Sequence, residues 1–258
     1  IATQWPLSVR TIEAWPMPSP DDFDCAGVRD ACREREEYAV YLGGPGLADV
    51  INSTGMIMSV ERVMTGLATG DKAVLRYIDR KTDLELEVAR RTLAAADGGI
   101  DFLWMGEDLG TQTGPLIGRR TYRRFIRPRH QAFVDLAGEF GVPVMIHTCG
   151  SSSWAYGDFI EMGVSAVDTL QPEAADMSPE YLVKTFGTRL SYHGCISTAG
   201  PLATGTAGET AEAVKRTLAI MMPTRGYCCA PTHQIQDNTP AENVVAMYET
   251  AKKHGRYS

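Results

Sequence analysis

The chain has 258 residues, of which 44% are hydrophobic and 22% are charged, with 25 glycines and 14 prolines. This ordinary globular composition excludes a disordered, collagen-like or coiled-coil chain. A formal net charge of −7 argues against broad binding to nucleic acid or to anionic membranes.

Residues 1–37 are expected to form an irregular N-terminal segment, because Pro6, Pro16, Pro18 and Pro20 interrupt any long helix or strand. No charged-then-apolar leader opens the chain, and no apolar run approaches the roughly 18 residues of a membrane span. The first residue is Ile1 rather than Met. We therefore expect the sequence to begin inside a longer gene product.

From residue 38 onward, short β-branched or aromatic runs alternate with stretches of helical periodicity. The predicted strands are residues 38–42, 101–105, 142–147, 166–170, 189–193 and 227–230. The predicted helices are residues 71–96, 121–140, 178–186, 208–222 and 240–252, the last with Thr239 as its N-cap and Pro240 in its first turn.

Strands that are each followed by a helix predict parallel pairing with right-handed crossovers, as in an open doubly wound sheet or a (β/α)8 barrel. The barrel is favoured because unusual polar residues follow the strand ends, which meet at one mouth in a barrel. These residues are Glu107, Asp108, His147, Cys149, Gln171, Glu173, His193, Cys195 and His233. No dinucleotide-binding or P-loop motif occurs. We expect one domain over residues 1–258.

The tetrapeptide His147-Thr148-Cys149-Gly150 ends a predicted strand. A His and a Cys two residues apart on an extended segment point to the same side, which supplies half of a zinc site. The alternative is a buried Cys beside a hydrogen-bonded His. A third ligand must come from another strand end, and the candidates are His233, Cys228 and Cys195.

An acidic turn, Glu107-Asp108 within residues 106–112, follows another strand. An acid there is suited to orient a substrate, act as general base or donate an oxygen to a metal, whereas the alternative is a solvated turn. We expect Asp108 to face the cavity and Glu107 to point away, because adjacent residues alternate sides. A run of six arginines between Arg119 and Arg129 predicts either a solvated face or a site for an anionic ligand.

Six cysteines are too few for a disulfide framework, and adjacent Cys228 and Cys229 do not suit one structural bridge. A reducing, cytoplasmic compartment is therefore expected.

Over residues 38–254 the chain resembles the uroporphyrinogen decarboxylase superfamily, and within it the corrinoid-linked methyltransferases. Residues 106–116 resemble the acidic turn of that branch, residues 126–130 its next helix, and residues 144–150 its H-x-C-G strand. Residues 171–177, Phe186-Gly187, residues 230–233, Asp237, Thr239-Pro240 and Glu242-Asn243 follow in the expected order.

This resemblance implies a distorted (β/α)8 barrel that binds zinc and works with a corrinoid protein and a small-molecule methyl donor or acceptor. The metal ligands expected from it are His147, Cys149 and His233, although a Cys takes the place of His233 in the best-known thiol methyltransferases. The catalytic residues expected are Asp108, Glu107 and His193, and the substrate-binding residues are Gln112, Gln171, Glu173 and Gln236.

The implied mechanism is Lewis-acid activation, in which zinc lowers the pKa of a bound thiol or polarises a leaving group. Two alternatives are a metal-free decarboxylase of a tetrapyrrole-type polycarboxylate and a non-catalytic barrel that binds a corrinoid or a small ligand. Six strands are two fewer than the family barrel has. We therefore expect N-terminal strands to be missing and the barrel to be open between its first and last strands, with upstream residues or a homo-oligomer covering the gap.

Overall fold

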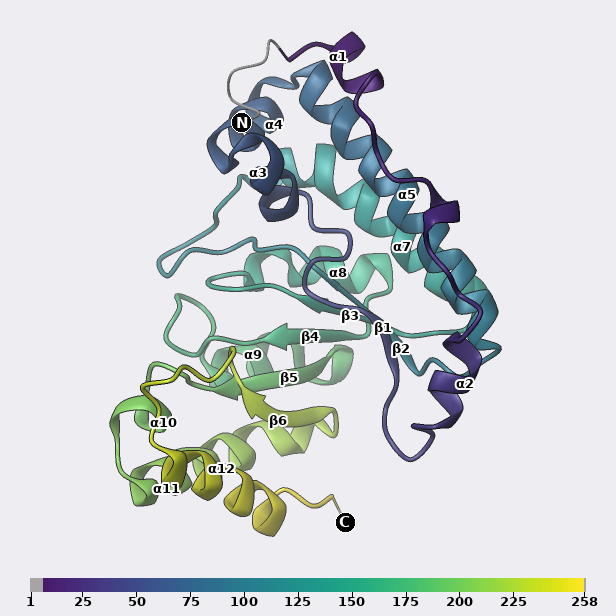
Figure 1. Cartoon of the computed structure of the whole chain (residues 1–258). Coiled ribbons are helices and arrows are strands. Elements are labelled where there is room, and N and C mark those ends of the chain that lie inside the picture. The colour runs from purple at the N-terminus through teal and green to yellow at the C-terminus, as the bar shows by residue number, and fades with distance from the viewer. Residues whose placement is uncertain (1–6, 258) are drawn as a thin grey trace. The chain divides into compact units, whose positions relative to one another are not determined.

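Six β-strands alternate with helices in the computed structural model of the chain, which describes residues 7–257 (Figure 1). Within this range the strands follow one another through the sheet in chain order. The pairs β1–β2, β4–β5 and β5–β6 are parallel. The strands are β1 (Tyr41–Gly43), β2 (Phe102–Gly106), β3 (Val144–His147), β4 (Ala166–Thr169), β5 (Ser191–Ile196) and β6 (Tyr227–Pro231). The predicted α/β class and all six predicted strands are thus confirmed.

The chain divides into two compact units. The N-terminal unit comprises the residues up to Asp108 together with Ile117–Ile146, and the C-terminal unit comprises Leu109–Leu116 together with the residues from His147 onward. Strand β3 therefore belongs to the first unit except for its last residue, His147. In the part of the chain that the structure describes, the strand order ends at β1 and β6. No helix within residues 7–257 has the length and apolarity that crossing a membrane requires.

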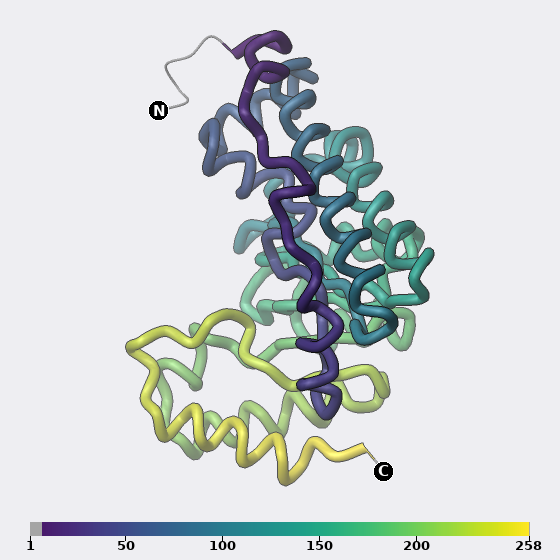
Figure 2. Tube along the Cα trace, turned by 45° about the vertical axis from the view of Figure 1, so that its right-hand side comes forward, coloured from purple at the N-terminus to yellow at the C-terminus, as the bar shows by residue number. Residues whose placement is uncertain are grey.

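The N-terminal unit is mainly helical around β1, β2 and most of β3. Its helical elements are α1 (Val9–Glu13), η2 (Pro20–Asp22), α2 (Val28–Arg33), α3 (Ile51–Met58), α4 (Val60–Thr69), α5 (Lys72–Ala96), α6 (Arg119–Thr121), η3 (Tyr122–Ile126) and α7 (Arg127–Glu139). The segment predicted to be irregular thus contains short helices, although residues 1–6 lie outside the described residues. It runs along α5 (Figure 2), where Arg91 pairs with Asp21.

Helix α5 forms where its periodicity predicted it. Asp71 caps its first turn by accepting hydrogen bonds from the N–H groups of Ala73 and Val74. Its apolar stripe is buried, and it ends at Asp97, whose φ of 51° is left-handed. Helices α3 and α4, which the sequence analysis missed, meet at Ser59, whose hydroxyl caps α4 by accepting from the N–H of Arg62.

The helix predicted over residues 121–140 is not continuous. Its first part is a π-helical turn, η3, before α7 begins at Arg127. A π-turn adds a residue to the helical repeat and so rotates the side chains that follow it. Within the arginine run, Arg129 pairs with Asp79 on α5.

The C-terminal unit alternates β4, β5 and β6 with helices. Its helical elements are η4 (Ser153–Ala155), α8 (Tyr156–Met162), α9 (Pro179–Phe186), η5 (Gly187–Arg189), α10 (Pro201–Thr204), α11 (Ala207–Met221), η6 (Met222–Thr224) and α12 (Ala241–His254). A capping box between Thr206 and Glu209 starts α11, which packs against α12. The N-cap of α12 is Pro240 rather than the expected Thr239.

Candidate metal and catalytic site

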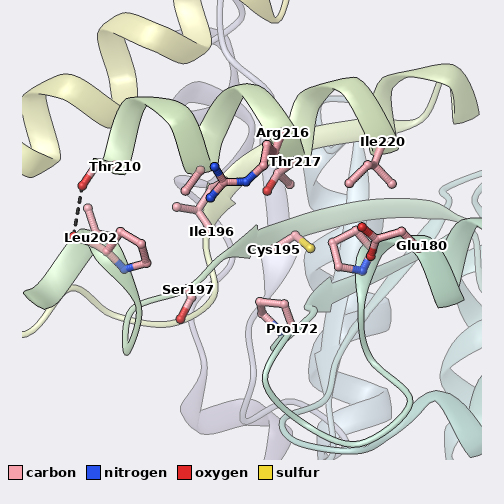
Figure 3. Close-up of a pocket in the computed structure, with 13 residues that line it drawn as sticks. Pro172, Glu180, Cys195, Ile196, Ser197, Leu202, Thr210, Arg216, Thr217 and Ile220 are labelled. Carbon is pink, nitrogen blue, oxygen red and sulfur yellow. Dashed lines mark hydrogen bonds between the residues drawn. The ribbon is translucent and has the colours of Figure 1, made fainter. Parts of the chain in front are cut away.

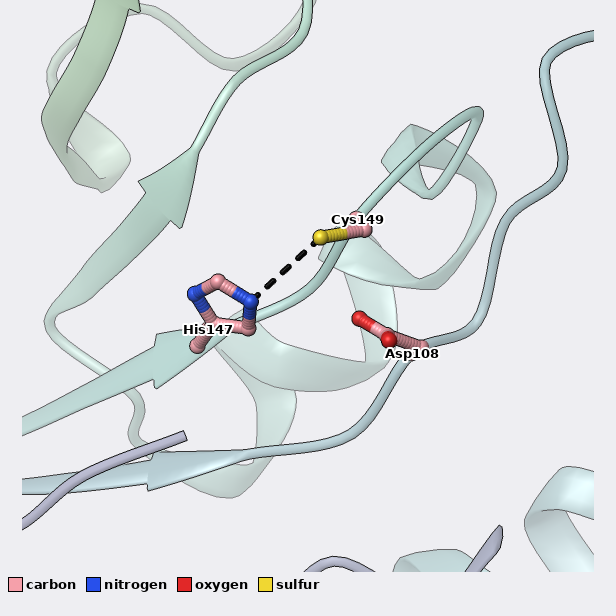
Figure 4. A group of neighbouring side chains, drawn as sticks. All are labelled: Asp108, His147 and Cys149. Atoms are coloured by element: carbon pink, nitrogen blue, oxygen red, sulfur yellow. Dashed lines mark hydrogen bonds between the residues drawn. The ribbon is translucent and has the colours of Figure 1, made fainter. Parts of the chain in front are cut away.

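The strand β3 delivers the His-x-Cys pair that the sequence predicted. Cys149 Sγ lies 3.4 Å from His147 Nε2, so the thiol and one imidazole nitrogen face each other (Figure 4). A thiol sulfur and an imidazole nitrogen are donors that zinc takes in proteins. The donor set therefore fits zinc.

His147 is held from behind by β4. Its Nδ1 lies 2.7 Å from Asp168 Oδ2 and 2.8 Å from Thr169 Oγ1. A carboxylate that accepts the Nδ1–H fixes the tautomer and leaves Nε2 as the coordinating atom. Burial would raise the pKa of Asp168, but hydrogen bonds to His147 and His193 outweigh it and place this pKa at about 2. Asp168 is therefore a permanent carboxylate behind the metal-facing imidazole.

The same carboxylate also holds His193 on β5. His193 Nδ1 lies 2.6 Å from Asp168 Oδ1, so the two carboxylate oxygens serve two different histidines. The hydrogen bond to Asp168, with a second one to Cys228, raises the pKa of His193 to about 9. His193, which was predicted to be catalytic, is thus a cation at neutral pH.

Asp108 and Glu107 have different surroundings. Asp108 Oδ2 accepts a 2.8 Å hydrogen bond from Asn52 Nδ2 on α3. The next residue, Leu109, donates its N–H to Thr148 Oγ1 at 3.3 Å, within the segment that links His147 to Cys149. The residue that follows the acidic pair, Leu109, is therefore hydrogen-bonded to the His-x-Cys segment.

Glu107 is buried and points into the N-terminal unit. Its carboxylate accepts hydrogen bonds from the N–H groups of Val50 and Ile51, at 2.8 and 3.1 Å, and lies 3.6 Å from His130 Nε2. Burial raises the pKa of Glu107 to about 8 and lowers that of His130 to about 4. Glu107, proposed from sequence as catalytic, therefore lies in a buried cluster that joins the start of α3 to α7.

The other predicted residues lie at varied places in the C-terminal unit. The ring of His233 is exposed, and its centroid lies 6.5 Å from that of His147. Gln171 Oε1 accepts a 2.6 Å hydrogen bond from the N–H of Gly150 and so holds the turn after Cys149. The side chains of the remaining three predicted substrate-binding residues are exposed: Gln112, Glu173 and Gln236.

Cys195, one alternative third ligand, is only 2% exposed, and burial raises its thiol pKa to about 12. It lines a pocket of about 250 Å³ between β5, α9 and α11, with Glu180 and Arg216 among the other lining residues (Figure 3). Cys228, the other alternative, is exposed and contacts His193.

Asp168 is the main residue that the sequence analysis missed. The signal is a carboxylate inside the predicted strand 166–170, because a buried charge requires a partner. The backbone around it is also unusual, since φ is 91° at Thr169 and 48° at Leu170. Positive φ at a β-branched residue is rare, and such conformations cluster at functional sites.

Comparison with known proteins shows that the chain is similar to methyltransferases. The chain is 25% identical over 191 residues to the methylcobamide:CoM methyltransferase MtbA of Methanosarcina acetivorans, an alignment that covers 73% of this chain and 51% of that protein. It thus spans about half the length of this curated relative. The structure matches a methyltransferase from Methanosarcina mazei with a TM-score of 0.67 and 19% identity, covering 89% of this chain and 64% of the other.

This structural match and the parallel sheet confirm the predicted α/β fold of the TIM-barrel type. The family model for uroporphyrinogen decarboxylase (URO-D) matches residues 3–254, nearly the whole chain. The chain therefore belongs to the uroporphyrinogen decarboxylase family.

Proposed function

We propose that this protein is a zinc-dependent methyltransferase that moves a methyl group between a corrinoid protein and a small-molecule donor or acceptor. The observation that carries the proposal is the facing pair of His147 Nε2 and Cys149 Sγ with Asp168 behind the imidazole. A metal-free decarboxylase has no use for this pair, which favours the methyltransferase over the alternative. The name of the Methanosarcina acetivorans relative supports a methylated corrinoid as one reaction partner.

The proposed metal ligands are His147, Cys149 and His233. Zinc bound there supplies Lewis acidity, which lowers the pKa of a thiol acceptor or polarises a leaving group. Asp168 keeps the proton on Nδ1 of His147 and so presents Nε2 to the metal. Asn52 fixes the Asp108 carboxylate through its amide.

His193 is proposed as a catalytic residue because it is a cation near these ligands, held by Asp168. Gln112, Gln171, Glu173 and Gln236 are proposed to contact the small molecule, and Gln171 also holds the Gly150 turn. The corrinoid arrives on a partner protein. The six cysteines, all within the described residues, form no disulfide, which fits the proposed cytoplasmic location because that compartment is reducing.

Metal analysis of the purified protein tests this proposal. We expect about one zinc per chain in the wild type, loss of the zinc in Cys149→Ser, and retention in Cys25→Ser, a matched change at a cysteine far along the chain. Demethylation of methylcobalamin by a small thiol, followed by absorbance, is expected to fail in the same variant. A protein without zinc, or a Cys149→Ser variant that keeps it, contradicts the proposal.

A further inference from the structure

A row of three side chains crosses the sheet of the C-terminal unit beside the His147–Cys149 pair. In the parallel register, Asp168 on β4 is aligned with His193 on β5, and His193 is aligned with Cys228 on β6. Residues aligned on neighbouring parallel strands project to the same face of the sheet. The backbone register therefore places a carboxylate, an imidazole and a thiol side by side.

Two of these side chains are also hydrogen-bonded to each other. Asp168 Oδ1 lies 2.6 Å from His193 Nδ1, and the strand register places Cys228 beside His193 on the next strand. A carboxylate that orients an imidazole, which in turn contacts a thiol, is the arrangement that activates cysteine nucleophiles in enzymes. Because Asp168 binds Nδ1, the ring nitrogen left for the sulfur is Nε2.

The charges in the row favour a sulfur anion. The groups that face Cys228 are His193 on β5 and, behind it, Asp168 on β4. The hydrogen bond from His193 lowers the pKa of the Cys228 thiol and outweighs burial and the repulsion by Asp168. The row therefore favours an imidazolium between a carboxylate and the anionic form of the thiol.

The neighbouring cysteine provides an internal contrast. Cys229 is adjacent in the chain, but on a strand its side chain points to the opposite face. Burial raises the pKa of its thiol, and its hydrogen-bond partner is Tyr227 rather than an imidazole. Cys228 is also exposed, whereas Cys229 is half-buried. Of these two thiols, only that of Cys228 is both exposed to solvent and next to an imidazole.

We propose that Cys228 is a nucleophilic thiolate, positioned by His193 and Asp168, that accepts alkyl groups from soft carbon electrophiles at a site separate from the His147–Cys149 pair. In the reaction Sγ attacks the electrophilic carbon, a carbon–sulfur bond forms, and the bond to the leaving group breaks with departure of that group as an anion. His193 keeps its proton and loses its ion-pair partner. An activated methyl group belongs to this class of electrophile. The proposal does not depend on the methyltransferase function.

Alkylation of the intact protein with iodoacetamide tests this site. Tandem mass spectrometry of the digested protein resolves modification at Cys228 from that at Cys229, and the rate of each is measured from pH 6 to 10. We expect alkylation of Cys228 to reach half of its maximal rate at a pH below 9.0, the ordinary thiol pKa. For Cys229 we expect this midpoint to lie above pH 9.0. A Cys228 profile with its midpoint at or above 9.0 overturns the proposal, and this comparison needs no variant.

The variant His193→Gln removes the cation but keeps a hydrogen-bonding side chain. We expect it to slow alkylation of Cys228 about tenfold at pH 7 and to leave the rate nearly unchanged at pH 10, where the Cys228 thiol is largely ionised in both proteins. Equal slowing at both pH values would mean that His193 controls access instead, which contradicts its assigned role. The rate at Cys25 is the control for the reagent and for the fold.

Repeating the reaction with one equivalent of Zn²⁺ separates the two sites. We expect zinc to protect Cys149 while Cys228 continues to react. Protection of both cysteines would make Cys228 a metal ligand and overturn the separate site. Protection of neither, with the Cys228 profile intact, would instead count against the proposed zinc site and leave the nucleophile in place.

Discussion

The carboxylate of Asp168 holds the imidazole of His147 through a 2.7 Å contact between Oδ2 and Nδ1. This contact determines which ring nitrogen is available to a metal, because it leaves Nε2 of His147 facing the sulfur of Cys149. The other oxygen of the same carboxylate serves His193. One buried acid thus organises two histidines, and its loss affects both.

Asp168→Asn is expected to weaken zinc binding by about 10- to 100-fold, because the neutral amide no longer fixes His147 as a carboxylate does. Affinity is measured by competition with a chromophoric chelator. The control is Asp176→Asn, an exposed position in the same unit whose φ of 57° suits asparagine. Equal affinities for the two variants would show that Asp168 plays no part in metal binding.

Asp108→Asn is expected to lower the rate of methyl transfer by about 100-fold while changing the free energy of unfolding by less than about 1 kcal/mol. The reason is that Asp108 is the carboxylate expected to act in catalysis, whereas the hydrogen bond that Asn52 Nδ2 donates to it can be donated equally to an amide oxygen. The rate and urea unfolding are measured on the same preparation. A parallel loss of both would assign Asp108 a structural role.

The raised pKa of Glu107 makes the free energy of unfolding depend on pH. Its folded pKa of about 8 is raised above the ordinary 4.5, chiefly by burial. The stability that the neutral form contributes is therefore fully present below pH 4.5 and is lost as the pH rises through 8. Gln has the shape of the protonated acid and does not titrate.

We accordingly expect Glu107→Gln to gain stability relative to the wild type between pH 5 and pH 9, as measured by urea unfolding at both values. Taking the difference between the two proteins removes titrations that they share. A difference that stays constant across this range would mean that Glu107 is already ionised at pH 5.

The turn after Cys149 is expected to accommodate only glycine at residue 150. Gly150 has φ of 69°, and a Cβ there would lie 2.6 Å from backbone atoms of Gly110. Gly150→Ala should therefore cost about 2 kcal/mol or more of unfolding free energy and also weaken zinc binding. The control is Gly114→Ala, where a Cβ meets nothing within 4 Å. Equal stability of the two variants would contradict the packing described here.

Much of the fold could be predicted because β-branched runs and helical periodicity report burial directly, as in α5. The His-x-Cys pair could be predicted because both ligands lie on one strand. The link from Asp168 to His147 could not, because it joins two strands whose register no local pattern encodes. The π-turn at Tyr122–Ile126 was missed for a similar reason, since it shifts the helical phase without interrupting the apolar pattern.

The third metal ligand can be tested by comparing two candidates, His233 and Cys228. His233 lies on the loop after β6 with its ring centroid 6.5 Å from that of His147, whereas Cys228 is engaged by His193. We expect His233→Ala to lower zinc affinity about tenfold or more, and Cys228→Ser to leave it unchanged, in the same chelator competition. The reverse pattern would make Cys228 the ligand and free His193 from its ion pair, which the pH profile of iodoacetamide labelling at Cys228 would reveal independently.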